Sequence, residues 1–125
     1  MLEIHPIKDE AEIEALKKKY EDSFISHDAV FLRSEELGEP TGICAFKIHS
    51  GEDMEIELLD TEDKIAGDLL IRAAISYGEN RGVANCTALH SDNDSIFVGV
   101  GFESGEEKLF INVSKVIHYR RNDKW

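Results

Sequence analysis

The sequence predicts one α/β domain with a mixed, mostly antiparallel sheet that contains a single pair of parallel strands. Residues 54–89 form a strand, a long helix and a second strand in turn, and such a βαβ unit brings its two strands parallel. The apolar segments before residue 54 are shorter and separated by turns rich in Gly and Pro, which is typical of antiparallel strands. With 125 residues, 42% of them hydrophobic, the chain fits a single domain over residues 1–125 with its own core.

The βαβ unit is predicted from two different periodicities. Met54, Ile56 and Leu58 alternate with glutamates, which is the period of a half-buried strand. From Lys64 onward the apolar residues recur at helical spacing, in the two rows Ile65–Leu69–Ala73–Tyr77 and Ala66–Leu70–Ala74. Thr61 or Asp63 can cap this helix, and Gly82 can end it in the left-handed conformation. The backbone N–H groups at the helix start then form an anion site.

The remaining elements follow from the same patterns. The sequence predicts strands at Leu2–His5, Ala29–Arg33, Thr41–His49, Met54–Leu59, Ala84–His90 and Lys108–Ile117. It predicts helices at Asp9–Asp22, Lys64–Asn80 and Ser95–Val100, and a hairpin loop at Glu36–Pro40. The tail His118–Trp125 is expected to be exposed or docked through its aromatic residues.

Composition and charge narrow the classes of partner. The formal charge is −12, from 26 acidic and 14 basic residues, which argues against nucleic acid or an anionic membrane surface as partners. It suits a cationic acceptor, although bacterial cytoplasmic proteins are often acidic for solubility alone. No apolar run approaches the roughly 20 residues of a membrane span, and the N-terminus lacks a signal-peptide pattern. We therefore expect a cytoplasmic protein in which Cys44 and Cys86 are reduced core residues.

Several motifs occur in an order that resembles the GCN5-related N-acetyltransferases, which bind acetyl-CoA. In that family a strand runs into R/Q-x-x-G-x-G/A, followed two residues later by an apolar pair on the helix. If Leu69-Leu70 is that pair, Ala66 is the last motif position, whereas Lys64 and Thr61 replace the glycine and the Arg/Gln. The helix end Asn80-Arg81-Gly82 and the later Gly101-Phe102-Glu103 are also similar to the family's pattern.

The resemblance implies an acyl-CoA N-acyltransferase-like fold, in which the two parallel strands splay apart, with the second helix reduced to Ser23–Asp28. It implies acetyl-CoA as co-substrate and no metal. The residues that it places at the donor are Leu58, Leu59, Lys64, Ile65, Ala66, Gly67, Asp68, Asn93 and Phe97. A second interpretation of the loop from Thr61 to Asp68 is a capped helix start, because its three acidic residues oppose a polyanion and Lys64 carries a Cβ where the family has glycine.

Amine acetylation needs a group that removes the ammonium proton, and often an acid for the departing thiolate. The resemblance implies a carboxylate on the central strand, where Glu57 and Glu55 stand. Alternation places both on the face opposite Met54 and Ile56, where a pair of carboxylates could either line the acceptor cleft or lie on an exposed strand face. The position of the family's tyrosine holds Phe97, which has no hydroxyl.

The cluster His90, Asp92, Asn93 and Asp94 is interpreted as helix capping rather than a metal site, because the glycine and glutamate spacing of a calcium loop is absent. The leading functional hypothesis is an acyltransferase that moves an acetyl group from acetyl-CoA to an unidentified small amine or amino group. The alternatives are a catalytically degenerate member of the fold that serves as a binding or dimerisation module, and a purely structural domain. The acceptor is not encoded in any motif, and a homodimer is left open.

Overall fold

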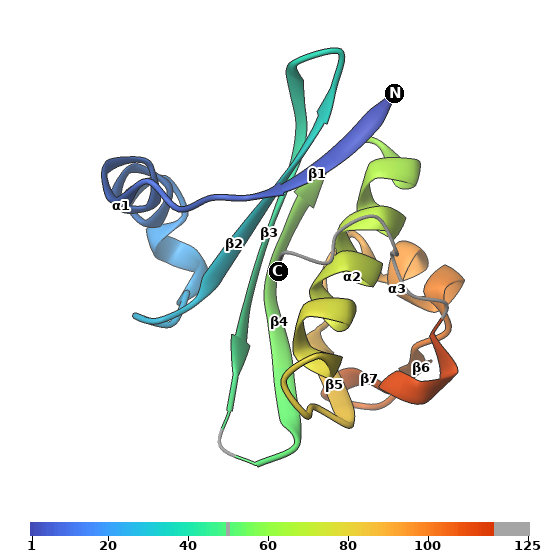
Figure 1. Ribbon diagram of the computed structural model, residues 1–125. Coiled ribbons are helices and arrows are strands. Elements are labelled where there is room, and N and C mark those ends of the chain that lie inside the picture. The colour runs from blue at the N-terminus through green and yellow to red at the C-terminus, as the bar shows by residue number, and fades with distance from the viewer. Residues whose placement is uncertain (50, 117–125) are drawn as a thin grey trace.

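The computed structural model describes residues 1–49 and 51–116, which form a seven-stranded sheet in the order β1-β2-β3-β4-β5-β7-β6 with helices on both faces (Figure 1). The strands are β1 (Leu2–Pro6), β2 (Val30–Glu36), β3 (Glu39–Ile48), β4 (Asp53–Thr61), β5 (Asn85–Leu89), β6 (Glu103–Ser104) and β7 (Lys108–Asn112). The helices are α1 (Glu10–Lys19), α2 (Lys64–Glu79) and α3 (Asp94–Val100), with the 3-10 turns η1 (Glu21–Ser23) and η2 (Val113–Lys115). Among the described strands, β4 and β5 alone pair in parallel, which confirms the predicted fold class.

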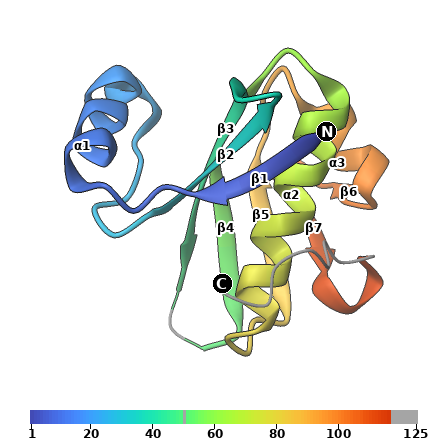
Figure 2. The same cartoon turned by 45° about the horizontal axis from the view of Figure 1, so that its top comes forward.

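The two faces of the sheet carry cores of different size. Both ribbon views show α1 apart from α2 and α3, on the other side of the sheet (Figures 1 and 2). The larger core lies against α2 and α3 and includes Phe46, Met54 and Leu70, each fully or almost fully buried. The smaller core, on the α1 side, consists of Ile7, Phe31 and Ala45 with half-buried residues packed around them. The larger face therefore supplies most of the apolar burial that stabilises the domain.

Helix α2 forms as its periodicity predicts, with one exception. The row Ala66, Leu70 and Ala74 is fully buried against the sheet. Of the two predicted candidates, Thr61 and Asp63, it is Asp63 that forms the N-cap, and Gly82 takes a left-handed φ of 88° in the turn that follows. Ile65, predicted to share an apolar row with Leu69, is 69% exposed, although its neighbour Ala66 in the same turn is fully buried.

Strand β4 contains an irregularity that strict alternation does not predict. Ala45 of β3 pairs with Leu58 and the next residue, Phe46, pairs with Ile56, so Glu57 is an additional residue in β4. Leu58 consequently packs with the smaller core, although the sequence predicted it on the same face as Met54 and Ile56. Leu59 then returns to the larger core. The bulge places Glu57 and Leu58 together on the α1 side of the sheet.

Other predicted boundaries need correction. The reduced second helix at Ser23–Asp28 is wrong, since η1 ends at Ser23 and irregular chain follows. The first helix ends at Lys19 instead of Asp22, and the closing strand ends at Asn112, where η2 takes over. Strand β6 was not predicted. Ile117 and the predicted tail His118–Trp125 lie outside the described residues.

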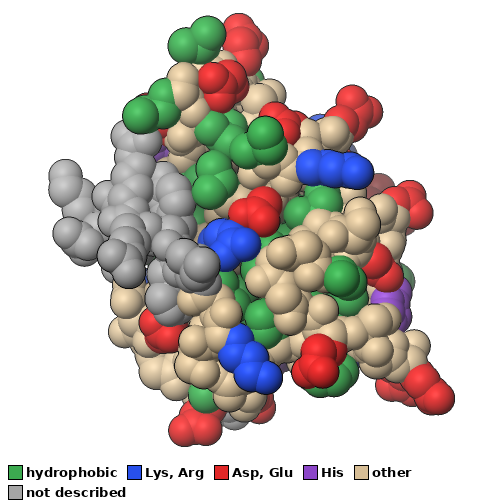
Figure 3. Space-filling view, turned by 90° about the vertical axis from the view of Figure 1, so that its right-hand side faces the viewer, with side chains coloured by type: hydrophobic (Ala, Val, Ile, Leu, Met, Phe, Trp, Pro, Cys, Tyr) green, Lys and Arg blue, Asp and Glu red, His purple; other side chains and the backbone are tan. Residues whose placement is uncertain are grey.

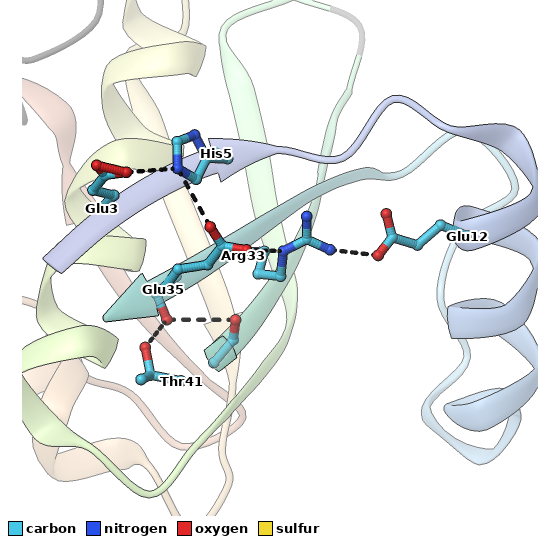
Figure 4. A network of polar contacts seen from close by, with 8 residues as sticks. Glu3, His5, Glu12, Arg33, Glu35 and Thr41 are labelled. Carbon is cyan, nitrogen blue, oxygen red and sulfur yellow. Dashed lines mark hydrogen bonds and ion pairs between the residues drawn. The ribbon is translucent and has the colours of Figure 1, made fainter. Parts of the chain in front are cut away.

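A polar network fastens α1 to the sheet (Figure 4). The guanidinium of Arg33 on β2 donates to the Glu12 carboxylate on α1, and its Nε donates to Glu35 Oε2 at 3.1 Å. On β1, His5 Nε2 lies 3.2 Å from Glu3 Oε1 and 3.6 Å from Glu35 Oε1. Because α1 has no fully buried residue, these contacts and the half-buried Ile13 and Leu16 hold it in place.

Candidate functional site

The two parallel strands separate at their carboxyl ends. Their ladder ends where Ile56 pairs with Ala88; β4 continues to Thr61, whereas β5 ends at Leu89. A cavity of about 200 Å³ opens at this point, lined by Ser23, Ile56, Glu57, Leu58, Leu59, Leu89, His90, Ser91 and Phe97. This cavity, called the splay cavity below, brings together four residues that the sequence predicted for the site: Glu57, Leu58, Leu59 and Phe97.

The carboxylate of Glu57 accepts two hydrogen bonds from Ser26. The backbone N–H of Ser26 donates to Glu57 Oε1 at 2.9 Å, and the Ser26 hydroxyl donates to Oε2 at 2.5 Å. The two donors fix the orientation of the carboxylate. Sequence reasoning missed Ser26, because it lies 31 residues from Glu57 in irregular chain and belongs to no motif.

Glu55 has a different environment from Glu57. Lys108 Nζ on β7 lies 2.6 Å from Glu55 Oε2, and His49 Nε2 lies 3.9 Å from Oε1. Its side chain is only 15% exposed, so the sequence-based alternative of an exposed strand face does not describe it. Glu55 does not line the splay cavity, and the structure therefore does not bring the two predicted catalytic carboxylates together there.

Asn93 spans the opening between β4 and α3. Its Nδ2 donates to the backbone carbonyl of Leu59 at 2.7 Å, so the side chain does not cap α3 although Asn93 is the N-cap residue. Asp94 instead accepts from the backbone N–H of Ser91 at 2.8 Å. Phe97 is 2% exposed and packs edge-on against Phe102, with ring centroids 5.1 Å apart. Of these two residues predicted to bind the acyl donor, Phe97 lines the splay cavity, and Asn93 contacts the cavity residue Leu59.

His90 ties the end of β5 to two neighbouring segments. Its Nδ1 lies 2.7 Å from Asp94 Oδ2, and its Nε2 lies 2.8 Å from the Gly105 carbonyl. Both partners are acceptors, so only the imidazolium form can donate to both. The Asp94 hydrogen bond, followed by that of Gly105, raises the pKa of His90. Among residues 1–49 and 51–116, no group of three or more His, Cys, Asp or Glu side chains is arranged to hold a metal ion.

The start of α2, where the sequence predicted an anion site, is capped by the protein's own Asp63 carboxylate. Asp63 Oδ1 accepts from the backbone N–H groups of Ile65 at 2.9 Å and Ala66 at 3.2 Å. The N–H of Gly67 donates to the Asp63 carbonyl at 2.9 Å. These amides are the ones expected to hold a phosphate, and the carboxylate that occupies two of them has the same sign of charge as a phosphate.

A second cavity, of about 230 Å³, lies between α2 and α3 and is lined by Lys64, Asp68, Ser95, Ile96 and Gly99. Asp68 is paired with Arg72 one turn along α2, with Oδ1 2.6 Å from Nε. Of the predicted donor residues on α2, Lys64 and Asp68 therefore face a cavity, whereas Ala66 and Gly67 are buried. The face of the molecule that carries α3 displays apolar, acidic and basic side chains intermixed (Figure 3).

The two core cysteines and the tyrosines do not add reactive groups to the splay cavity. Cys44 and Cys86 are buried and free, as predicted, and burial raises the pKa of the Cys44 thiol to about 12. The Tyr20 hydroxyl donates to Asp60 Oδ2 at 2.5 Å, and burial together with this bond raises the pKa of Tyr20. Neither Tyr20 nor Tyr77 lines the cavity, so within the described part of the chain no tyrosine replaces the hydroxyl that Phe97 lacks.

Comparison with known proteins gives a likeness of fold alone. A scan against protein-family models and a search of curated proteins found no match. Within the described residues, none of the helices has the length and apolar character to cross a membrane.

Many solved structures share the architecture. N-acetylglutamate synthase from Neisseria gonorrhoeae, solved with coenzyme A and N-acetyl-glutamate, aligns with a TM-score of 0.68 at 17% identity over 90% of this chain, which spans only 35% of that enzyme's chain. IAA acetyltransferase from Bacillus cereus aligns at 0.72 and 12% identity, over 90% of this chain and 99% of its own. The ribosomal-protein-S18-alanine N-acetyltransferase from Escherichia coli aligns at 0.69 and 11%, over 98% and 99%. The chain therefore has the fold of the GCN5-related N-acetyltransferases.

Proposed function

We propose that this chain is a divergent N-acyltransferase that moves an acetyl group from acetyl-CoA to a small amine or amino group. The observation that carries the proposal is the splay cavity, which is lined by Glu57, Leu59 and Phe97 and lies where the parallel ladder of β4 and β5 ends. The Neisseria enzyme of the same fold was solved with coenzyme A bound, which supports an acyl-CoA as donor.

In the proposed complex the acyl thioester lies in the splay cavity and the diphosphate lies near Lys64 at the start of α2. The lining of the cavity suits this donor, since apolar side chains stand beside a few polar ones, Ser23, Glu57, His90 and Ser91. The start of α2 fits less well, because the Asp63 carboxylate has to leave the amides of Ile65 and Ala66 before phosphate oxygens can take them. Lys64 offsets part of the acidic charge in this loop.

The proposed reaction is direct transfer. Glu57 takes a proton from the acceptor ammonium, and the freed nitrogen lone pair attacks the thioester carbonyl carbon. The C–N bond forms, the nitrogen loses its second proton to water, and the C–S bond breaks. The sulfur leaves as the coenzyme A thiolate and takes its proton from water, because Phe97 carries no hydroxyl. Glu57 returns its proton to solvent, so the products are the amide and free coenzyme A.

The second candidate is a binding module that keeps the fold without catalysis. It is favoured by the Asp63 carboxylate on the α2 amides and by the residues at Thr61 and Lys64, which differ from the family's pattern. This candidate shares the cavity with the first and differs from it only in turnover.

The test is a calorimetric titration of acetyl-CoA into the purified chain, followed by a thiol-release assay with alkylamines, amino acids, polyamines and a peptide N-terminus. Binding with amine-dependent thiol release is expected. Binding without release for every amine would support the module, and the absence of any heat of binding would contradict both candidates.

A further inference from the structure

We propose that Ser26 is the positioning residue for Glu57: it holds the carboxylate in place and aimed at the acceptor. This inference deepens the proposed function and rests on it. Ser26 does not line the splay cavity, so it is expected to act on the acceptor only through Glu57.

The geometry of the Ser26–Glu57 contact is that of a clamp. One residue donates to both carboxylate oxygens, from its backbone N–H at 2.9 Å and from its hydroxyl at 2.5 Å. A carboxylate has about four lone-pair sites, so two donors leave acceptor capacity on Glu57 for an ammonium proton. The two bonds fix the rotation of the carboxylate, and fixed orientation is what a general base requires in addition to its charge.

The bulge in β4 explains why Glu57 needs such a partner. Glu57 has no opposite residue in the ladder with β3, and the ladder with β5 has already ended at Ile56. Neighbouring strands therefore do not restrict its side chain as they restrict Glu55. An unrestrained glutamate would sample several rotamers, and only some of them would face the cavity.

The segment that carries Ser26 is itself anchored on both sides of the serine. Ile25 packs into the smaller core, and the His27 carbonyl accepts from Lys17 Nζ at 2.6 Å. Asp28 pairs with Lys47 of β3 at 2.9 Å, a contact that also lowers the pKa of Asp28. The position of Ser26 is thus set by α1 and β3 independently of Glu57, as a positioning role demands.

The test compares Ser26→Ala, Ser26→Thr and wild type with acetyl-CoA and n-butylamine as the substrates. Ser26→Ala keeps the backbone N–H bond and loses the hydroxyl, so we expect kcat to fall about tenfold while KM for acetyl-CoA stays unchanged. Ser26→Thr, which retains a hydroxyl, should restore most of kcat. The fall is expected in kcat because Glu57 acts on the proton in the transition state and not on donor binding.

Ser114→Ala is the matched control. Ser114 also donates to a single side chain from its N–H and its hydroxyl, at 3.0 and 2.6 Å from Asn112 Oδ1, but it lies in η2, beyond the end of β7 that pairs with the start of β5. This variant should leave kcat unchanged. If the single variant Glu57→Gln is strongly impaired while Ser26→Ala keeps the wild-type kcat, the positioning role of Ser26 is overturned and the proposed function is not. A wild type that neither binds acetyl-CoA nor releases thiol would overturn the proposed function, and this inference with it.

Discussion

At the scale of single residues, Glu55 and Glu57 project from the α1 side of β4 into different surroundings. Glu55 is neutralised by Lys108 at 2.6 Å, whereas both oxygens of Glu57 accept only neutral donors from Ser26 in the contacts described. A carboxylate that is already paired with an ammonium gains little by binding a second one. Of the two predicted catalytic residues, Glu57 is the one whose environment suits proton removal.

The first prediction follows from this difference. Glu57→Gln should lower amine-dependent thiol release about a hundredfold, the usual contribution of a positioned base. Glu55→Gln should lower it far less, because neither Glu55 nor its partner Lys108 lines the cavity. Equal losses in the two variants, measured as kcat/KM with acetyl-CoA, would show that the environments of the two carboxylates do not decide the chemistry.

Asp63 is the second residue whose contacts bear on the proposed function. In Asp63→Asn the side-chain oxygen can still cap α2 while the negative charge is removed. We expect acetyl-CoA to bind about tenfold more tightly, since a like charge near a phosphate costs about 1 kcal/mol or more in a partly solvated site. Calorimetry on Asp63→Asn and on the control Glu62→Gln checks this.

Glu62→Gln removes the same charge from the neighbouring residue, for which no bond to the α2 amides is described. A similar gain in both variants would mean that the loop's total charge matters and that occupancy of the two amides does not.

At the scale of elements, the contact between α2 and α3 depends on the absence of a side chain at Gly67. A Cβ there would lie 2.9 Å from Ile96 Cδ1 and 3.1 Å from Thr61 Cγ2, whereas a Cβ at Gly99 of α3 would meet nothing within 4 Å. Gly67→Ala should therefore lower the free energy of unfolding by about 1–3 kcal/mol through overpacking. Gly99→Ala should raise it by up to about 1 kcal/mol through helix propensity. Denaturant unfolding of the pair measures both signs.

His90 connects β5 to the start of α3 and to the turn between β6 and β7. Because the folded pKa of His90 is raised above 6.5, its stabilising effect is complete below pH 6.5 and is lost as the pH rises through the folded value. The difference in melting temperature between wild type and His90→Gln should be largest below pH 6.5 and shrink above it. A difference that grows with pH would show that the neutral ring is the bound form.

At the scale of the whole molecule, the charge of −12 acts on any polyanionic donor. Long-range repulsion between the chain and acetyl-CoA is screened by salt, so the association rate should rise between low and physiological ionic strength. A cationic amine should show the opposite trend. Stopped-flow measurements at several salt concentrations test both, and an association rate for acetyl-CoA that falls with salt would indicate a local basic surface that outweighs the net charge.

Sequence periodicity was sufficient to predict most helices and strands, but it was insufficient to predict the contacts between their side chains. The alternation at Met54 and Ile56 and the helical rows from Ala66 placed β4, α2 and β5 within a few residues, because each pattern reflects burial on one face. The bulge at Glu57 has no residue signature, so alternation assigned Leu58 to the wrong face. The clamp by Ser26 joins residues far apart in the chain, and only packing in three dimensions determines it.

The early end of the β4–β5 ladder has a further consequence. An open sheet normally has two edges, which here are β1 and β6, and each edge can template the pairing of an additional strand. Past Ile56 the backbone of β4 pairs only with β3 in the described ladders, so the molecule has another edge in its interior, on which Asn93 satisfies the Leu59 carbonyl. The cavity beside it, of about 200 Å³, is too small for another protein strand. An edge that could cause aggregation on the outside of the sheet is therefore shielded here from pairing with another chain.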